Sequence, residues 1–84
     1  MEEKFKNFVI SNGIDGLTNE KYVEVNPDIY DEQGDLVVQI LYESDTDELI
    51  FYCLDEHDNG YNKTINDFCE YTLARVAESI GLDL

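Results

Sequence analysis

Alternating positions in the middle of the chain predict a β-hairpin. Residues 36–43 place apolar side chains on both faces of an extended segment, and residues 49–54 repeat the pattern. Residues 44–47, Ser-Asp-Thr-Asp, are a polar connection of a length common in hairpins. Because both segments are apolar on both faces near their centres, we expect the hairpin to lie centrally in its sheet.

The N-terminal third predicts one short helix and one short strand. Phe5, Phe8 and Val9 stand at helical spacing. We expect this helix to end at Asn12-Gly13, with the glycine in the left-handed conformation. Residues 14–20 contain two turn signals and predict an ordered loop, whereas residues 22–25 predict a strand that ends before Pro27.

The last third predicts a polar loop, residues 55–63, followed by one long helix. Thr64 is a suitable N-cap, Asp67 lies in the first turn, and Gly81 ends the helix. Its buried stripe should consist of Ile65, Phe68, Cys69, Leu73, Val76, Ala77 and Ile80. The expected fold of residues 1–84 is therefore a single α+β domain. It has a short N-terminal helix, a three-stranded antiparallel sheet and a long C-terminal helix packed on one face.

Charge changes this picture most. The chain has 20 acidic and 5 basic residues, a formal net charge of -15, and residues 22–62 contain twelve Asp and Glu but no Lys or Arg. With 43% hydrophobic residues the chain should still fold. Crowded carboxylates repel one another, so we expect raised carboxyl pKa values and greater stability with added salt or mild acidification. A fold that keeps such repulsion is expected to meet a strongly positive partner.

The sequence carries no motif for catalysis or for a cofactor. It has no Gly-rich phosphate loop, no nucleophile elbow and no Cys or His pair at metal-ligand spacing. Asp55, Asn59 and Gly60 match positions of an EF-hand calcium loop. His57 stands where an oxygen ligand is expected and Asn66 replaces the bidentate Glu, which favours a polar turn. We expect a protein that is not an enzyme and needs neither a cofactor nor a metal.

The cysteine content and the distribution of apolar residues predict the cellular compartment of the protein. Two cysteines are too few for a secreted disulfide scaffold, so Cys53 and Cys69 should be small buried side chains in a reducing environment. No secretory signal opens the sequence, and no apolar run is long enough to span a bilayer. We therefore expect a soluble protein of the host cell cytosol that avoids anionic membranes and does not itself bind nucleic acid.

Acidic residues at the two strand ends are the candidate contacts with a positive partner. Glu43, Asp45, Asp47 and Glu48 surround one hairpin, and Asp55, Glu56 and Asp58 lie at the other strand end. Tyr42 and Tyr61 add flat amphipathic groups of the kind enriched in interfaces. Tyr42 and Tyr52 are equally compatible with a place in the core, which is the commoner role of aromatic residues in strands.

A short, strongly acidic chain with this element order resembles the phage-encoded DNA mimics. These include anti-CRISPR proteins of the helix–three-strand–helix type and the uracil-DNA glycosylase inhibitor, and the segment from Tyr42 to Leu49 is similar to their acidic hairpins. The resemblance implies a stoichiometric inhibitor that occludes the groove of a basic nucleic-acid-binding protein, such as a nuclease or CRISPR effector. An immunity protein against a basic nuclease toxin, or an acidic adaptor unrelated to nucleic acid, fits the same residues.

Overall fold

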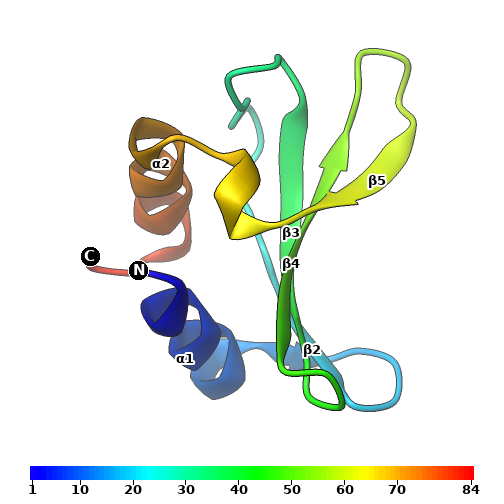
Figure 1. The fold of residues 1–84 in the computed structure, drawn as a ribbon, viewed down its shortest axis with the longest axis vertical. Coiled ribbons are helices and arrows are strands. Elements are labelled where there is room, and N and C mark those ends of the chain that lie inside the picture. The colour runs from blue at the N-terminus through cyan, green and yellow to red at the C-terminus, as the bar shows by residue number, and fades with distance from the viewer.

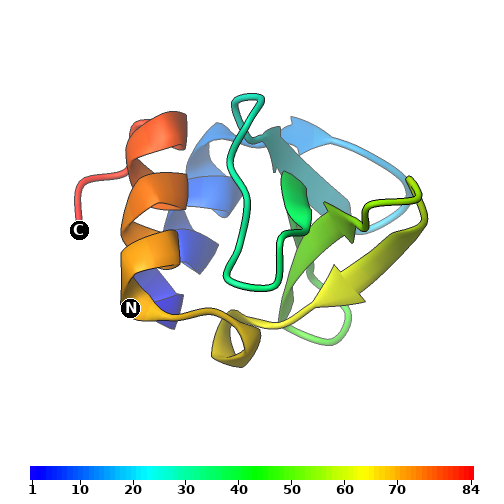
Figure 2. The ribbon, with the colours of Figure 1, turned by 90° about the horizontal axis from the view of Figure 1, so that it is seen from above.

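The computed structural model describes residues 1–84 and contains one antiparallel sheet with two helices on a single face (Figure 1). The sheet is a meander, because its spatial order β1-β2-β3-β4-β5 is also the chain order. Figure 2 shows both helices on the same side of the sheet. The elements, in chain order, are α1 (Glu2–Asn12), β1 (Ile14–Asp15), β2 (Glu20–Glu24), β3 (Leu36–Glu43), β4 (Glu48–Leu54), β5 (Gly60–Lys63), a 3₁₀ turn (Ile65–Asp67) and α2 (Glu70–Ile80).

The central hairpin forms as predicted, but the expected three-stranded sheet is wrong because the sheet has five strands. The two missed strands lie at its edges and lack an apolar alternation. β1 has only two residues, both exposed, and pairs with β2. β5 reads Gly-Tyr-Asn-Lys and pairs with β4, turning a lysine toward the core. Backbone pairing to a neighbouring strand, rather than side-chain hydrophobicity, makes both segments extended.

The expected long C-terminal helix is also wrong. Thr64 and Asp67 do form a capping box, but around the short 3₁₀ turn. Phe68 is extended, with φ -120° and ψ 147°, and α2 begins only at Glu70. The break lets the Phe68 ring reach Phe51, at 4.9 Å between ring centroids. Cys69 is exposed at the helix N-cap, which corrects the expectation that it is buried.

The core lies between the helices and one face of the sheet. Phe5 and Val9 of α1 and Val76 of α2 are fully buried against Ile40 and Phe51 of the central strands. Phe5 meets Phe51 edge-on, with centroids 5.6 Å apart. Gly81 ends α2 in the left-handed conformation, whereas Gly13 is extended, contrary to expectation. Gly13 is needed for another reason, since a Cβ there would lie 2.4 Å from the Val9 carbonyl oxygen.

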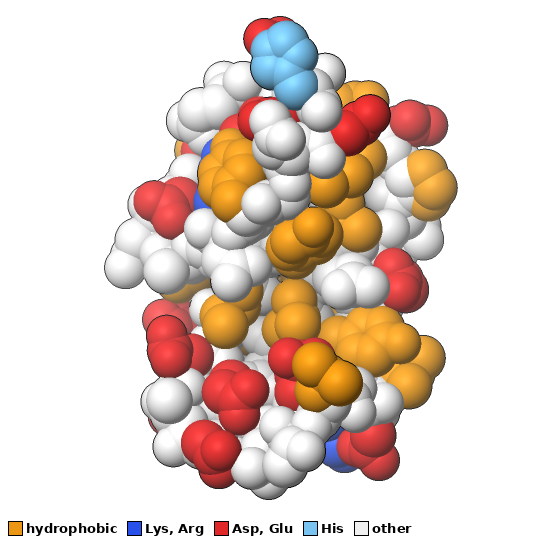
Figure 3. Space-filling model, turned by 90° about the vertical axis from the view of Figure 1, so that its right-hand side faces the viewer, with side chains coloured by type: hydrophobic (Ala, Val, Ile, Leu, Met, Phe, Trp, Pro, Cys, Tyr) orange, Lys and Arg blue, Asp and Glu red, His pale blue; other side chains and the backbone are white.

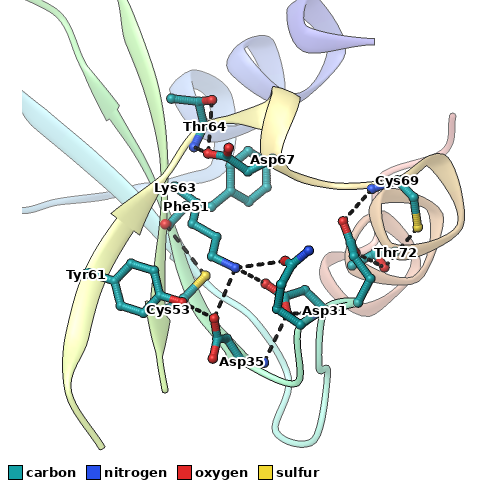
Figure 4. Close-up of polar contacts among 12 residues, drawn as sticks. Asp31, Asp35, Phe51, Cys53, Tyr61, Lys63, Thr64, Asp67, Cys69 and Thr72 are labelled. Atoms are coloured by element: carbon teal, nitrogen blue, oxygen red, sulfur yellow. Dashed lines mark hydrogen bonds and ion pairs between the residues drawn. The ribbon is translucent and has the colours of Figure 1, made fainter. Parts of the chain in front are cut away.

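A buried lysine joins the far edge of the sheet to the long connection between β2 and β3. The Lys63 ammonium donates to the carboxylates of Asp31 and Asp35 and, at 3.1 Å, to Gln33 Oε1 (Figure 4). The Asp31 side chain has no exposed surface and also accepts the backbone N–H groups of Gln33 and Asp35. The Tyr61 hydroxyl donates to Asp35. Every charge in this cluster is therefore both paired and hydrogen-bonded.

Glu32, which follows Asp31 in the β2–β3 connection, joins this connection to α2. Glu32 accepts the Cys69 backbone N–H at 2.9 Å and the Thr72 hydroxyl at 2.9 Å. The Glu32 carboxylate thereby satisfies one of the free N–H groups at the start of α2, as a capping side chain does. Residues 31–35 thus hold together β5, the start of β3 and the start of α2.

Removing the lysine should destabilise the fold strongly. Lys63→Met leaves two carboxylates in the interior without a counter-charge, and breaking a buried pair in this way typically costs about 3–5 kcal/mol. The bare carboxylates should then gain protons, so the variant should become more stable on acidification from neutral pH toward about pH 5. Denaturant unfolding at both pH values measures this, and a loss below about 1 kcal/mol would show that the cluster contributes little.

Candidate functional site: the open face of the sheet

The helices leave one face of the sheet uncovered, and we call it the open face. Strand register assigns its residues, because directly opposite residues of antiparallel strands point to the same side. Figure 3 looks onto this face: hydrophobic side chains cross its middle and acidic side chains lie around them. Its members are Ile14, Glu20, Tyr22, Glu24, Leu36, Gln39, Leu41, Glu43, Glu48, Ile50, Tyr52, Leu54, Gly60 and Asn62.

An apolar band crosses four strands of the open face. The register aligns Ile14 of β1, Tyr22 of β2, Leu41 of β3 and Ile50 of β4 in one row. Tyr22, Leu41 and Ile50 are half-buried, while Ile14 is 60% exposed. Tyr52, Leu54 and Leu36 continue the apolar surface along β3 and β4. The central strands are apolar on both faces. On one face their side chains form part of the core, and on the other they form an exposed patch.

A row of three carboxylates borders this band. Glu20 of β2, Glu43 of β3 and Glu48 of β4 are direct cross-strand partners. Like charges directly opposite each other in a sheet are destabilising, with Cβ atoms about 4.5–5.5 Å apart. None of the three takes part in an ion pair, and none accepts a side-chain hydrogen bond. We call Glu20, Glu43 and Glu48 the acidic row.

The structure divides the predicted acidic contacts between two ends of the molecule. The turn between β3 and β4 and the turn between β4 and β5 lie at opposite ends of the sheet (Figure 1). The seven residues of β4 separate them by about 24 Å. Glu43 and Glu48 are brought together, but Asp55, Glu56 and Asp58 are remote from them. Glu20 completes the row and was missed, because it fell in a predicted loop and only the β2–β3 register places it there.

Asp47 is engaged in contacts within the fold, although its side chain is 70% exposed. It adopts a left-handed φ of 54° and accepts the Tyr42 hydroxyl at 2.8 Å and the Lys6 ammonium at 3.2 Å. These hydrogen bonds, the one from Tyr42 first, lower the pKa of Asp47. The contact fastens the hairpin to α1. Asp45 is also engaged, since it accepts Asn19 Nδ2 at 2.9 Å and so links the two turns at this end.

Neither tyrosine named as a contact lies on the open face. Tyr42 is directed to the helix side and packs against the core, which is the alternative that the sequence had left open. Tyr61 is 39% exposed, but its hydroxyl is held by Asp35 and its strand partner is the buried Cys53. The tyrosines that the open face does present are Tyr22 and Tyr52.

The turn at the far end is held by its own hydrogen bonds. Asp55 accepts the backbone N–H groups of His57 at 2.8 Å and Asn59 at 2.9 Å, and the Asn59 side chain at 3.3 Å. The bond from the Asn59 backbone is the largest of the effects that lower the pKa of Asp55. Glu56 is exposed and lies 3.4 Å from His57 Nε2, and Asp58 takes a left-handed φ of 62°.

Elsewhere in the molecule, no group of three or more His, Cys, Asp or Glu side chains is placed to hold a metal ion. Burial raises the pKa of the Cys53 thiol to about 12, which keeps the thiol protonated at neutral pH. A hollow of about 270 Å³ lies between the end of α1 and the β1–β2 turn, where Leu17 is 81% exposed. Neither helix is long and apolar enough to cross a bilayer.

Comparisons with known proteins identify no relative of this chain. No protein-family model, no curated protein and no solved structure matches this chain. The candidate site is therefore defined by its own geometry: an apolar band on an uncovered sheet face, bordered by the acidic row.

Neutralising the acidic row should stabilise the protein at low ionic strength. The triple variant Glu20→Gln, Glu43→Gln, Glu48→Gln removes three carboxylates that face one another, so its melting temperature should rise. The matched control Glu3→Gln, Glu78→Gln, Asp83→Asn removes the same charge from the helices and the C-terminus and should change it less. The difference should shrink as salt is added, because salt screens exposed charges. Equal melting temperatures at low salt would show that the row carries no specific repulsion.

Four carboxyl groups that accept hydrogen bonds should make the protein less stable in acid, opposite to the sequence expectation, because the pKa of each is lowered. Burial alone would raise the pKa of Asp31, but hydrogen bonds from Lys63 and two backbone N–H groups outweigh it. Hydrogen bonds likewise lower the pKa of Glu32, Asp47 and Asp55. Such groups bind more protons when unfolded.

The free energy of unfolding should therefore stay nearly constant from about pH 8 to pH 5 and fall below about pH 4, as the pH passes through the folded-state pKa values. Urea titrations across this range measure it. A gain in stability from neutral pH to about pH 5 would instead support raised carboxyl pKa values.

Proposed function

We propose that this protein is a stoichiometric inhibitor that occludes the nucleic-acid-binding groove of a basic DNA-binding enzyme. The observation that carries the proposal is the acidic row. Three carboxylates lie side by side on an exposed face without a cation, although their repulsion disfavours folding. A basic groove would supply the missing counter-charges.

The spacing of the row supports mimicry of a nucleic-acid backbone. Adjacent strands are about 4.8 Å apart, which sets the interval between Glu20, Glu43 and Glu48. A single DNA strand carries one phosphate for about each 3.4 Å of axial rise, and successive phosphates also wind around the axis. The line of carboxylates therefore offers Lys and Arg side chains a charge density of the same order as a phosphate backbone.

Inhibition on this account is occlusion without turnover. The net charge of -15 would steer the protein to a cationic groove, giving association that is fast and sensitive to salt. Carboxylates would then pair with the cations that hold phosphates. We place this encounter in the cytosol of a host cell, where a phage anti-CRISPR or other anti-defence protein would meet a defence nuclease. A nuclease toxin as the target would make the protein an immunity protein.

The acidic row should dominate capture of the target. We expect immobilised wild-type protein to retain a basic nucleic-acid enzyme from host lysate at low ionic strength and to release it as salt rises. The triple variant Glu20→Gln, Glu43→Gln, Glu48→Gln should bind the purified enzyme at least about tenfold more weakly, because truncating a desolvated charge pair costs about 2–5 kcal/mol. Affinity capture, identification by mass spectrometry and titration of the purified enzyme measure this.

The variant Glu3→Gln, Glu78→Gln, Asp83→Asn is the matched control, since it removes the same charge away from the open face. It should bind like the wild type at equal salt. If both triple variants lose affinity equally, binding depends on the net charge of the protein, and the acidic row does not contact the enzyme specifically. If the only retained proteins lack any nucleic-acid-binding function, the proposed function is wrong.

A further inference from the structure

The open face is not uniformly charged, and this bears on the kind of groove that it fits. The acidic row borders a row of apolar side chains, Ile14, Tyr22, Leu41 and Ile50. Beyond it, Tyr52 and Leu54 extend the apolar surface along β4, while Glu24 lies at the β2 side. A partner that covers this face must therefore present cations beside an apolar or aromatic surface.

Grooves for single-stranded and for double-stranded nucleic acid differ in this respect. Proteins that bind single strands combine a cationic groove along the backbone with aromatic side chains on which the unpaired bases stack. Duplex-binding surfaces contact mainly phosphates and polar base edges, and they are strongly basic and polar. An apolar band next to a line of carboxylates complements the first kind of groove.

The backbone of β5 restricts the position of the Tyr52 ring, which suits it to contact an aromatic groove. A Cβ on Gly60 would lie 1.8 Å from the Tyr52 hydroxyl, so the ring lies close over the backbone of β5 and only glycine leaves it room there. A ring fixed in this way loses little conformational freedom on binding. Tyr52 is half-buried on the open face.

We propose that the open face fits a groove that binds single-stranded nucleic acid. The acidic row takes the place of phosphates, and Tyr22, Tyr52 and the aliphatic residues between them take the place of unpaired bases. This inference rests on the proposed function and specifies the partner class. A second copy of this chain is the wrong occupant, because it would bring two acidic rows and two charges of -15 together.

The experiment releases captured protein with defined nucleic acids. Immobilised wild-type protein is loaded with host lysate at low ionic strength and washed. Equal columns are then eluted with an oligothymidylate of about 30 nucleotides or with a duplex of the same length, a length that spans several single-strand binding sites. We expect the single strand to release the retained enzyme at a concentration at least about tenfold below that of the duplex.

Three variants test the apolar band itself. Leu41→Thr with Tyr52→Thr removes apolar contacts while keeping residues suited to strands, and should weaken binding of the purified enzyme on the order of tenfold or more. Tyr52→Phe keeps the ring and should bind like the wild type. Tyr71→Thr with Leu84→Thr is the matched control, because both residues are exposed away from the open face. Circular dichroism melting verifies that each variant is folded, and an unfolded double variant is replaced by Ile50→Thr alone.

Each outcome decides between the two proposals. Release by duplex as readily as by single strand, or binding unchanged in the folded apolar variants, overturns this inference but leaves the proposed function standing. Release by neither nucleic acid, or no retained protein, overturns both. Self-association of the wild type through the open face also contradicts the inference, and analytical ultracentrifugation at low and high salt detects it.

Discussion

The ion pairs of Lys63 with Asp31 and Asp35 are the contact on which the arrangement of this fold depends. The lysine comes from the edge strand β5 and the carboxylates from the connection that leads into β3, while Glu32 between them caps α2. One cluster therefore sets the positions of the last strand and the second helix. Because the Asp31 side chain has no exposed surface, losing its partner would leave a bare charge in the interior. The fold uses one of its five basic residues to join parts that hydrophobic packing alone would leave free.

The open face follows from a second feature, which is the placement of the helices. Both helices, of eleven residues each, lie on one side of the sheet, and none of the elements in residues 1–84 covers the other side. The central strands are nevertheless apolar on both faces. A small domain that only needed to fold would place polar residues on the uncovered side, as antiparallel sheets commonly do. Exposed apolar side chains next to unpaired carboxylates are the features on which the proposed complex rests.

The sequence predicted those parts of the structure that depend on local side-chain pattern. The helix from Phe5 to Val9 and the hairpin at residues 36–54 follow from periodicity, and both are present. The edge strand β5 could not be predicted, because it forms by pairing with β4 and its lysine is buried against Asp31 and Asp35, about 30 positions earlier. The late start of α2, after the extended Phe68, has the same origin, since packing of Phe68 on Phe51 overrides helical spacing. Tertiary contacts therefore determine both the edge strand β5 and the start of α2.

The candidate site also contains residues that the local pattern predicts and residues that only the tertiary structure brings together. Glu43 and Glu48 flank a recognisable hairpin, so their proximity could be predicted from residues 36–54 alone. Glu20 joins them only through the β2–β3 register, which an eleven-residue connection sets and no local pattern reveals. Asp47 looked like its acidic neighbours in the sequence, but its left-handed backbone and its contacts with Lys6 and Tyr42 make it structural. Composition indicated a charged surface, and only the strand pairing distinguished structural from free carboxylates.

The most direct test of the account is to map the contact surface on this protein by NMR. Titration of the isotope-labelled protein with its purified target should shift the methyl signals of Leu41 and Ile50 and the amide signals of Glu20, Glu43 and Glu48. The exposed residues of α1 and α2 should stay unchanged. Shifts concentrated on the two helices, with the open face unaffected, would contradict the claim that the uncovered side of the sheet is the binding surface.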